Sequence, residues 1–226
     1  MFKGKVAIVT GSGTGIGEAT AIEIAKLGGK VTVNYSKSKD EAEATGRAVE
    51  EAGGEAIVIQ ANVSDDDDCK KLAKATLDKW GRIDILINNA GINHFGLLAE
   101  QSEDELRQML EANTIAPILL TKTLLPQLNQ TESAILNVGS GFGSIGYAGY
   151  CGYSASKFAL RGFSEALRRE LSDTSTKVLY LAPRATLTDM NSDEVIAMNK
   201  ELGNTMDPPA RVAAELIAQL KKTQHT

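Results

Sequence analysis

Residues 6–17 read VAIVTGSGTGIG, in which an apolar, β-branched run passes directly into a turn rich in glycine. Glycines at 11, 15 and 17 let the backbone turn sharply and leave space for a ligand at the N-terminus of a following helix. The turn alone fits either a tight connection that binds nothing or a site for the pyrophosphate of a dinucleotide. A strand that runs through such a turn into a helix indicates a layered α/β fold.

The same alternation of strand and helix continues along the chain. The expected strands are 6–10, 31–35, 55–60, 83–88, 133–138 and 177–182, and the amphipathic segments lie near 16–28, 39–53, 66–80, 102–128, 153–171 and 208–222. The strands are continuously apolar, as expected when helices cover both faces of a parallel sheet. We therefore predict a Rossmann-type, doubly wound α/β fold with about six parallel strands in the order 3-2-1-4-5-6, formed by a single domain over 1–226.

Composition argues against several classes of function. The 226 residues carry a net charge of −5 without a basic stripe, so nucleic acid is not an expected partner. No apolar run approaches the roughly 20 residues of a membrane helix, and the first residues lack a signal-peptide pattern. Cys69 and Cys151 match no metal spacing, and the sequence holds only two histidines. We expect a reduced, cytoplasmic protein that binds no metal and does not associate with membranes.

Two acidic signals predict helix starts. Asp65–Asp68, which follow Ser64, could hold a divalent metal or begin a helix. Four adjacent side chains in a helical turn point in different directions, which favours the helix start, and the positive end of the helix dipole favours carboxylates there. Asp207 before Pro208 likewise predicts the N-cap of a last helix.

A phenol and an ammonium lie one helical turn apart in YSASK, Tyr153–Lys157. Positions i and i+4 share a helix face, with Cβ atoms about 6 Å apart. An ammonium so placed lowers the tyrosine pKa from its usual value near 10 and prepares the phenol to exchange a proton. The alternative is a solvated helix face with a packed ring. Tyr147 and Tyr150 have no lysine at this spacing.

Taken together, these motifs resemble one enzyme family. T-G-x3-G-x-G at Thr10–Gly17, NNAG at Asn88–Gly91, Asn113, Ser140 and YSASK follow one another as in the short-chain dehydrogenases/reductases. The resemblance covers roughly residues 1–190. Within the family, the chain is similar to the 3-oxoacyl-carrier-protein-reductase-like members. Relatives often continue into a seventh strand, which this chain lacks after the segment 208–222, so six strands are expected.

The resemblance implies catalytic roles for four residues. Ser140 would hydrogen-bond a substrate carbonyl oxygen, and Tyr153 would donate the proton. Lys157 would also bind the nicotinamide ribose. Asn113 would position a water beside the lysine, although a structural hydrogen bond within the helix is its alternative role. The implied activity is the NADP(H)-dependent interconversion of a carbonyl and an alcohol by hydride transfer, and the alternative is a nucleotide-binding sensor or scaffold without turnover.

The choice of NADP(H) over NAD(H) depends on the end of the second strand. Tyr35 stands where NAD-preferring relatives carry an aspartate, and Lys37 could meet a ribose phosphate or remain a solvated loop lysine. Thr14 stands where many NADP-preferring relatives carry an arginine, and Asn62 replaces the usual aspartate beside the adenine but can still donate and accept hydrogen bonds. The expected cofactor contacts are Gly11, Ser12, Thr14, Gly15, Ile16, Gly17, Tyr35, Ser36, Lys37, Asn62, Val63, Asn89, Ala90, Gly91, Tyr153, Lys157, Pro183, Thr186 and Thr188.

The substrate pocket is expected in loops beyond the strand ends, at 94–95, 142–151 and 186–190. Arg184 replaces a glycine of the family, which is costly if the position needs a positive φ. It either binds an acidic substrate or, as we favour, is exposed on an adjusted loop. His94 either contacts substrate or makes a structural hydrogen bond. The expected pocket residues are His94, Phe142, Tyr147, Cys151, Arg184 and Met190, with a lid over 186–207 hinged near Gly203 and Asn204.

Two helices predict self-association. The apolar residues of 153–171 span roughly 220°, wider than the ~100° stripe that covers one sheet face, and the helix near 113–128 is similarly apolar. We expect a homodimer through these helices. A tetramer is possible, but relatives use the seventh strand for their second subunit contact.

Overall fold

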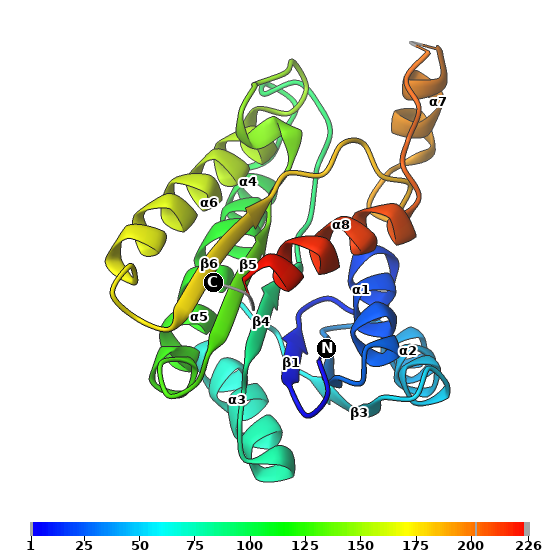
Figure 1. Cartoon of the computed structure of the whole chain (residues 1–226). Coiled ribbons are helices and arrows are strands. Elements are labelled where there is room, and N and C mark those ends of the chain that lie inside the picture. The colour runs from blue at the N-terminus through cyan, green and yellow to red at the C-terminus, as the bar shows by residue number, and fades with distance from the viewer. Residues whose placement is uncertain (1, 202, 224–226) are drawn as a thin grey trace.

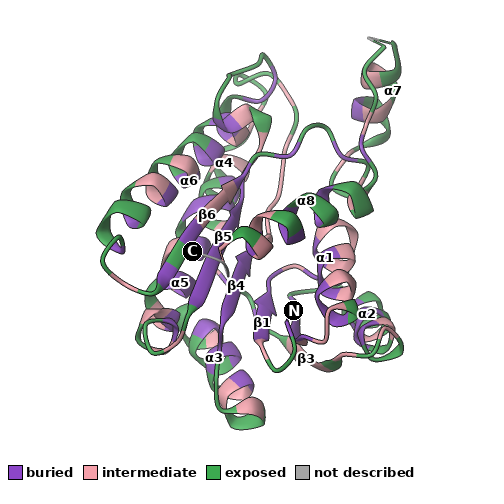
Figure 2. Cartoon of the chain, viewed as in Figure 1, coloured by how far each residue is buried: buried purple, intermediate pink, exposed green. Residues whose placement is uncertain are grey.

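The computed structural model describes residues 2–201 and 203–223, which contain a six-stranded parallel sheet in the order β3-β2-β1-β4-β5-β6 (Figure 1). The predicted sheet and strand order are confirmed. The strands are β1 Val6–Val9, β2 Lys30–Tyr35, β3 Glu55–Gln60, β4 Ile85–Asn88, β5 Ser133–Val138 and β6 Thr176–Leu181. Figure 2 shows that the central strands are almost wholly buried, which explains their continuously apolar sequences.

Helices cover both faces of the sheet and create two apolar cores. One core joins the sheet to α1 (Gly15–Lys26), α2 (Lys39–Glu51) and α8 (Pro209–Lys222). The other joins it to α3 (Asp66–Trp80), α5 (Ala116–Leu128) and α6 (Cys151–Glu170). Alternate residues of a strand feed opposite cores: Ala7 and Val9 enter the first, and Ile8 enters the second. None of the described helices is both long and apolar enough to cross a membrane.

The amphipathic segment 102–128 is divided into three helical pieces. It comprises α4 (Glu103–Leu110), the π-helical turn η1 (Glu111–Ile115) and α5. The π turn carries Asn113, whose side chain bonds both backbone groups of Ile92. A wider turn of this kind is common where a helix must present a functional side chain, so the π turn directs attention to Asn113.

The two predicted caps have different outcomes. Asp65 caps α3, since its carboxylate accepts the N–H groups of Asp67 and Asp68 at 3.0 Å each. No cluster of three or more potential metal ligands occurs in the described part of the chain. The prediction that Asp207 caps α8 is wrong, because Pro208 occupies the N-cap position. The backbone of Asp207 pairs instead with Ala185 and Leu187, and its carboxylate accepts a hydrogen bond from Arg211 at 3.0 Å.

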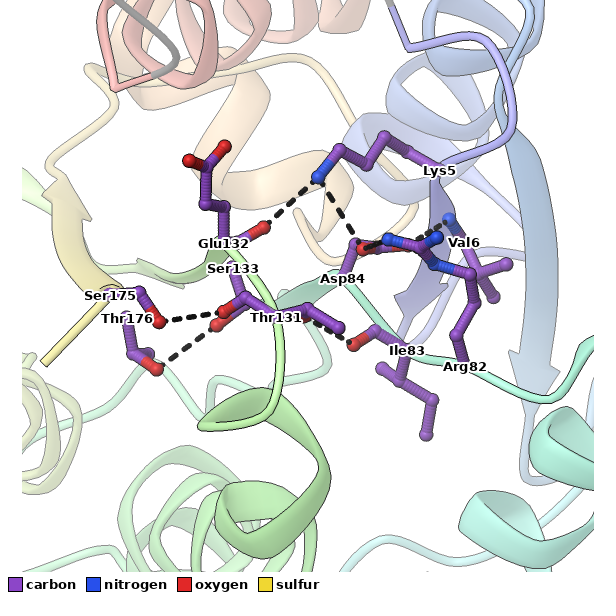
Figure 3. A network of polar contacts seen from close by, with 10 residues as sticks. All are labelled: Lys5, Val6, Arg82, Ile83, Asp84, Thr131, Glu132, Ser133, Ser175 and Thr176. Atoms are coloured by element: carbon purple, nitrogen blue, oxygen red, sulfur yellow. Dashed lines mark hydrogen bonds and ion pairs between the residues drawn. The ribbon is translucent and has the colours of Figure 1, made fainter. Parts of the chain in front are cut away.

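A polar network ties together the amino ends of the strands (Figure 3). Asp84, which is fully buried, accepts the N–H of Val6 at 2.9 Å and two hydrogen bonds from Arg82 at 2.6 and 2.9 Å. Lys5 lies 3.5 Å from the same carboxylate and donates to the carbonyl of Glu132. The network links β1, the start of β4 and the segment before β5, at the edge opposite the glycine turn.

Candidate active site

The glycine turn between β1 and α1 is held in place by a buried polar residue of β2. Asn34 accepts the N–H of Gly11 through Oδ1 at 3.3 Å, and its backbone bonds Ser12 in both directions at 3.0 Å. Gly11 and Gly15 have φ of +58° and +62°, and a Cβ at Gly17 would overlap the carbonyl oxygen of Gly11. These three glycines are therefore required by the turn itself. Asn34 was not predicted, although an asparagine within the apolar run VTVNY was a signal for it.

A cleft of about 480 Å³ opens beside the start of α1. Thr14 and Gly15 line one side, and Leu187, Thr188 and Pro208 line the other. Thr14 is the N-cap of α1 but its side chain makes no capping bond, so the first N–H groups of the helix are directed toward any ligand at this end. A helix N-terminus with glycine at the approach fits a pyrophosphate, so these residues fit a dinucleotide.

The second part of the expected cofactor site follows β2 and β3. Tyr35 packs into the apolar core, whereas Ser36 and Lys37 are exposed. The side-chain oxygen of Asn62 accepts the N–H of Ser64 at 3.2 Å. An amide oxygen has two lone pairs, so Asn62 can still both accept and donate a hydrogen bond. Lys37 forms no ion pair with any described residue, which leaves its ammonium available for an anion.

The NNAG segment lies directly against the glycine turn. Thr10 accepts the N–H groups of Asn89 and Ala90 at 3.0 and 2.9 Å, and the Asn89 amide donates to the carbonyls of Thr10 and Gly11. A Cβ at Gly11 would lie 2.9 Å from the Cα of Ala90. The first strand, the turn and NNAG thus form one rigid floor. Thr10 was missed as a site residue, since the contacts predicted in its motif began at Gly11.

The expected catalytic residues converge at the carboxyl edge of the sheet. Lys157 Nζ donates to the carbonyl of Val138 at 3.0 Å and lies 5.7 Å from the ring centroid of Tyr153. Ser140 follows β5, and its hydroxyl accepts the N–H of Phe142 at 3.2 Å. Ser140 also opposes the rise in the pKa of Tyr153 that burial causes, which agrees with its hydroxyl lying near the phenol.

Asn113 completes this group from the other side. Its Nδ2 donates to the carbonyl of Ile92 at 2.8 Å and to Ser156 Oγ at 3.0 Å, while its Oδ1 accepts the N–H of Ile92 at 2.8 Å. A Cβ at Gly91 would lie 2.8 Å from Asn113 Oδ1 and 3.6 Å from Lys157 Nζ. The structural role of Asn113 is therefore substantial, and it places the amide oxygen beside the lysine. Ser156, which connects α6 to the π-helical turn η1, was not predicted.

Burial sets the protonation of the two central groups. It raises the pKa of Tyr153 to about 12, although the Ser140 hydrogen bond opposes the rise. It lowers the pKa of Lys157 to about 8, because the ammonium loses water and gains no carboxylate partner. The prediction that Lys157 lowers the pKa of Tyr153 is wrong for the protein without ligand, since desolvation of the phenol outweighs any effect of the ammonium.

Aromatic rings surround Tyr153 on the expected substrate side. The Phe142 ring lies 4.9 Å from Tyr147 and 4.6 Å from Tyr150, and it meets Tyr153 edge-on at 6.2 Å. Tyr150 also packs against Phe95 at 4.9 Å. All four residues lie in the loops predicted to line the pocket, at 94–95 and 142–151. The structure therefore gives the catalytic phenol a mainly apolar border.

The other predicted pocket residues lie farther out. His94 Nδ1 lies 3.6 Å from a Glu105 carboxylate oxygen, beyond hydrogen-bonding distance, and Cys151 is exposed at the start of α6. Arg184 is exposed, and no described residue other than glycine has a positive φ. The arginine therefore causes none of the backbone strain that a positive φ would impose. Met190 is 42% exposed on the loop after β6.

The segment over 186–207 is clamped at its base. Leu187 N–H donates to the carbonyl of Asp207 at 3.0 Å, and Asp207 N–H donates to that of Ala185 at 2.8 Å. Between these ends lies α7 (Asp193–Glu201), in which Val195 is the buried residue. Gly203, which was predicted to be part of a hinge, has φ +69°. The clamp was not predicted, because it joins residues about twenty positions apart through backbone atoms alone.

Comparison with known proteins agrees with this geometry. Residues 5–199 match the short chain dehydrogenase family. The 3-oxoacyl-[acyl-carrier-protein] reductase of Synechocystis sp. is 39% identical over 84% of this chain and 77% of the relative. A short chain dehydrogenase from Burkholderia cenocepacia, solved in complex with NADP, has a TM-score of 0.88 at 32% identity, covering 95% of this chain and 89% of that one. The chain therefore belongs to the short-chain dehydrogenase/reductase family.

The family membership also fixes the class of activity. The protein is an NAD(P)-dependent oxidoreductase that acts on CH–OH groups. A short chain dehydrogenase/reductase from Burkholderia phymatum, solved in complex with NAD, shares the fold with a TM-score of 0.90 at 24% identity, covering 98% of this chain and 87% of that one. The structural neighbours therefore include complexes with both dinucleotides.

Proposed function

We propose that this chain is an NADP(H)-dependent enzyme that interconverts a ketone or aldehyde and the corresponding alcohol, with Tyr153 as general acid and base. The observation that carries this proposal is the buried pair of Tyr153 and Lys157 beside the Ser140 hydroxyl. With a pKa of about 12, the phenol keeps its proton at neutral pH and can donate it. An alternative role as a silent nucleotide sensor would give these three groups no chemistry to perform.

The chain's own residues account for the movement of the proton. A bound dinucleotide would supply the hydride that reduces the carbonyl carbon. Ser140 holds the carbonyl oxygen against the phenol, and Tyr153 gives that oxygen its proton. Lys157, with a pKa of about 8, then returns a proton to the phenolate. Asn113 Oδ1, beside the ammonium, is the acceptor for a water that connects Lys157 to solvent.

The rim of the site supports an apolar carbonyl substrate. Seven of the large apolar side chains that are exposed lie on the loops around it, each 42–61% exposed: Phe95, Leu97, Leu98, Ile145, Tyr147, Leu187 and Met190. The segment 141–149, GFGSIGYAG, carries no charge. Such a surface gains from contact with an apolar chain. Because the Synechocystis relative is a 3-oxoacyl-[acyl-carrier-protein] reductase, we include 3-oxoacyl thioesters in the proposed substrate class. His94, Cys151 and Arg184 would border the same pocket.

The preference for NADP(H) rests on Lys37. Its exposed ammonium follows β2 and has no described carboxylate partner, so it can meet a ribose phosphate. In the Lys37→Ala variant we expect the KM for NADPH to rise about fivefold, with the KM for NADH unchanged. Equal effects on both dinucleotides would contradict the preference.

We further propose that the chain works as a cytoplasmic homodimer, with 186–207 as a substrate lid on a single domain. Leu110, Ile115 and Phe158 are each 39–45% exposed on the helices around 103–128 and on α6. These are the helices whose apolar surface exceeds what one sheet face can cover. We expect light scattering to give the mass of a dimer at micromolar concentration, and a Phe158→Ser variant to shift the equilibrium toward monomer. A wild-type monomer would contradict the assembly.

The function is tested by NADPH oxidation with a panel of ketones, aldehydes, keto-sugars, quinones and 3-oxoacyl thioesters. We expect turnover with an apolar carbonyl class and a loss of about 10³-fold in kcat for Tyr153→Phe, because the proton donor is removed. Binding of NADPH, measured by fluorescence, should be retained in this variant. Turnover that survives the substitution would contradict Tyr153 as the acid, and NADPH binding without any turnover would favour the sensor.

A further inference from the structure

Tyr180 is a partly buried aromatic residue next to the loop that carries Ser140. In the β5–β6 pairing it lies opposite Asn137. The pairing continues past the strand ends, since Gly139 N–H donates to the carbonyl of Leu181 at 2.7 Å and Gly141 N–H donates to that of Pro183 at 3.1 Å. Ser140 therefore leaves the sheet at the level of Tyr180, with the tyrosine on the neighbouring strand.

Two glycines on either side of Ser140 make room for this ring. A Cβ at Gly139 would overlap the ring and the hydroxyl of Tyr180. A Cβ at Gly143 would lie 2.6 Å from the hydroxyl and 2.9 Å from the carbonyl oxygen of Lys157. Neither glycine has a positive φ, so backbone conformation does not require them. Glycine is required at these positions because Tyr180 occupies the space that a Cβ atom would take.

The need to fill space does not by itself explain why this residue carries a hydroxyl group. Its oxygen is buried and has no hydrogen-bond partner among the residues that the structure describes. The backbone N–H of Ser140 faces this oxygen, and it opposes the rise in the pKa of Tyr180 that burial causes, without reaching full hydrogen-bonding geometry. A phenylalanine would fill the same space without burying an unsatisfied group, so the retained oxygen calls for a reason.

We propose that Tyr180 is a positioning residue for Ser140: its ring and its hydroxyl occupy the notch formed by Gly139 and Gly143 and so fix the backbone on both sides of Ser140. The inference rests on the proposed role of Ser140 in binding the substrate carbonyl. Tyr180 itself touches neither substrate nor cofactor. It acts by fixing the backbone from which the Ser140 hydroxyl reaches Tyr153, and a displacement of about 1 Å at such a site costs up to 10²-fold in rate.

The test is a double-mutant cycle with a matched control. We expect Gly139→Ala to lower kcat about 100-fold without changing the KM for NADPH, because the new methyl displaces the loop from the ring. In a Tyr180→Leu background the same change should cost less than about threefold, since the overlap is gone. Gly141→Ala is the control: its Cβ would meet only the Pro183 carbonyl oxygen, at 3.9 Å, and kcat should stay within about twofold.

The hydroxyl is tested separately by Tyr180→Phe. This variant keeps the ring, and we expect kcat to fall about fivefold to tenfold with the KM for NADPH and the melting temperature nearly unchanged. An equal loss from Gly139→Ala in both backgrounds, or wild-type kcat in Tyr180→Phe, would overturn the corresponding part of the proposal. If Gly139→Ala does not fold, Tyr180→Phe still decides the role of the oxygen.

Failure of the proposed function is distinguished from failure of this inference by crystallography. If the wild type reduces no compound, the reductase proposal fails, but the position of Ser140 is still measurable. We expect crystals of Gly139→Ala to show the Ser140 hydroxyl moved away from Tyr153, and crystals of the double variant with Tyr180→Leu to show it returned. An unmoved Ser140 in Gly139→Ala would overturn the inference whatever the activity.

Discussion

The two ends of the sheet each bury a charged side chain, and they treat it in opposite ways. At the amino end, Asp84 is fully buried and is surrounded by Arg82, Lys5 and the N–H of Val6. At the carboxyl end, Lys157 is only 3% exposed and has one bond, to the carbonyl of Val138. No carboxylate in the described part of the chain lies within ion-pair distance of Lys157.

The difference separates a structural charge from a functional one. A buried carboxylate that is paired with two cations joins strands, and the protein is destabilised if any of these partners is removed. A buried ammonium without a counter-ion is costly, but its pKa falls to about 8, where it can exchange protons near neutral pH. The protein therefore concentrates stability at the amino end and accepts an unfavourable charge where the chemistry occurs.

The largest expected effect comes from removing the unpaired charge. In Lys157→Met we expect kcat to fall by about 10³-fold, because the phenol loses the group that returns its proton. The melting temperature should rise or stay the same, since a desolvated cation is replaced by an apolar chain of similar length. Turnover on the reductase panel and calorimetry provide the two readings. A clear loss of stability would break the comparison, because it would make Lys157 a structural residue as well.

The paired charge should show the reverse pattern. We expect Asp84→Asn to lower the free energy of unfolding by about 3 kcal/mol, since Arg82 and Lys5 lose the carboxylate that compensates them. Per folded molecule, kcat should remain near that of the wild type. Urea unfolding and turnover measured on the same preparation test both statements. If kcat falls more than about tenfold while the protein stays folded, the two ends are coupled and the comparison fails.

Sequence reasoning reached the strands and the glycine turn because these depend on short-range patterns, whereas the sheet order followed from topology rules and the proposed catalytic residues from the family resemblance. The apolar strands and the i, i+4 spacing of Tyr153 and Lys157 are local and periodic. The π turn at Asn113 was not predictable in this way, since it depends on contacts with Ile92 and Ser156. The raised pKa of Tyr153 is a property of packing. A sequence shows which residues are neighbours along the chain, but it does not show how far folding desolvates each side chain.

The same limit explains which site residues were missed. Asn34, Thr10 and Tyr180 lie against backbone groups of other segments, and the sequence around them does not show which groups they reach. Their contacts become visible only when strands that are distant in sequence are paired. Asp207 was misassigned for a related reason, because its backbone pairing with Ala185 and Leu187 outweighs a local capping signal. Sequence signals therefore marked the proposed catalytic groups better than the residues that hold them.

The pH dependence of stability sharpens the comparison further. Folding lowers the pKa of Lys157 to about 8 from its ordinary value near 10.5. Between these values the unfolded chain binds the proton that the folded chain has released, so stability rises with pH. Relative to Lys157→Met, we expect the wild type to gain roughly 2 kcal/mol between pH 8 and 10, measured by urea unfolding. A flat difference over this range would show that Lys157 keeps its proton and that burial is incomplete.

The smallest expected effect concerns the two cations that share Asp84. Arg82 makes two short bonds to the carboxylate, at 2.6 and 2.9 Å, whereas Lys5 lies 3.5 Å away. We expect Arg82→Ala to lower the free energy of unfolding by about 1–2 kcal/mol and Lys5→Ala by less than about 1 kcal/mol. Both cations are partly exposed, which reduces each value through solvent screening. The two variants are measured in parallel by urea unfolding, and neither should change kcat. The reverse order would mean that Lys5, through its longer contact with Asp84 and its bond to the Glu132 carbonyl, compensates most of the buried negative charge. Distance from the carboxylate would then not decide which cation stabilises it.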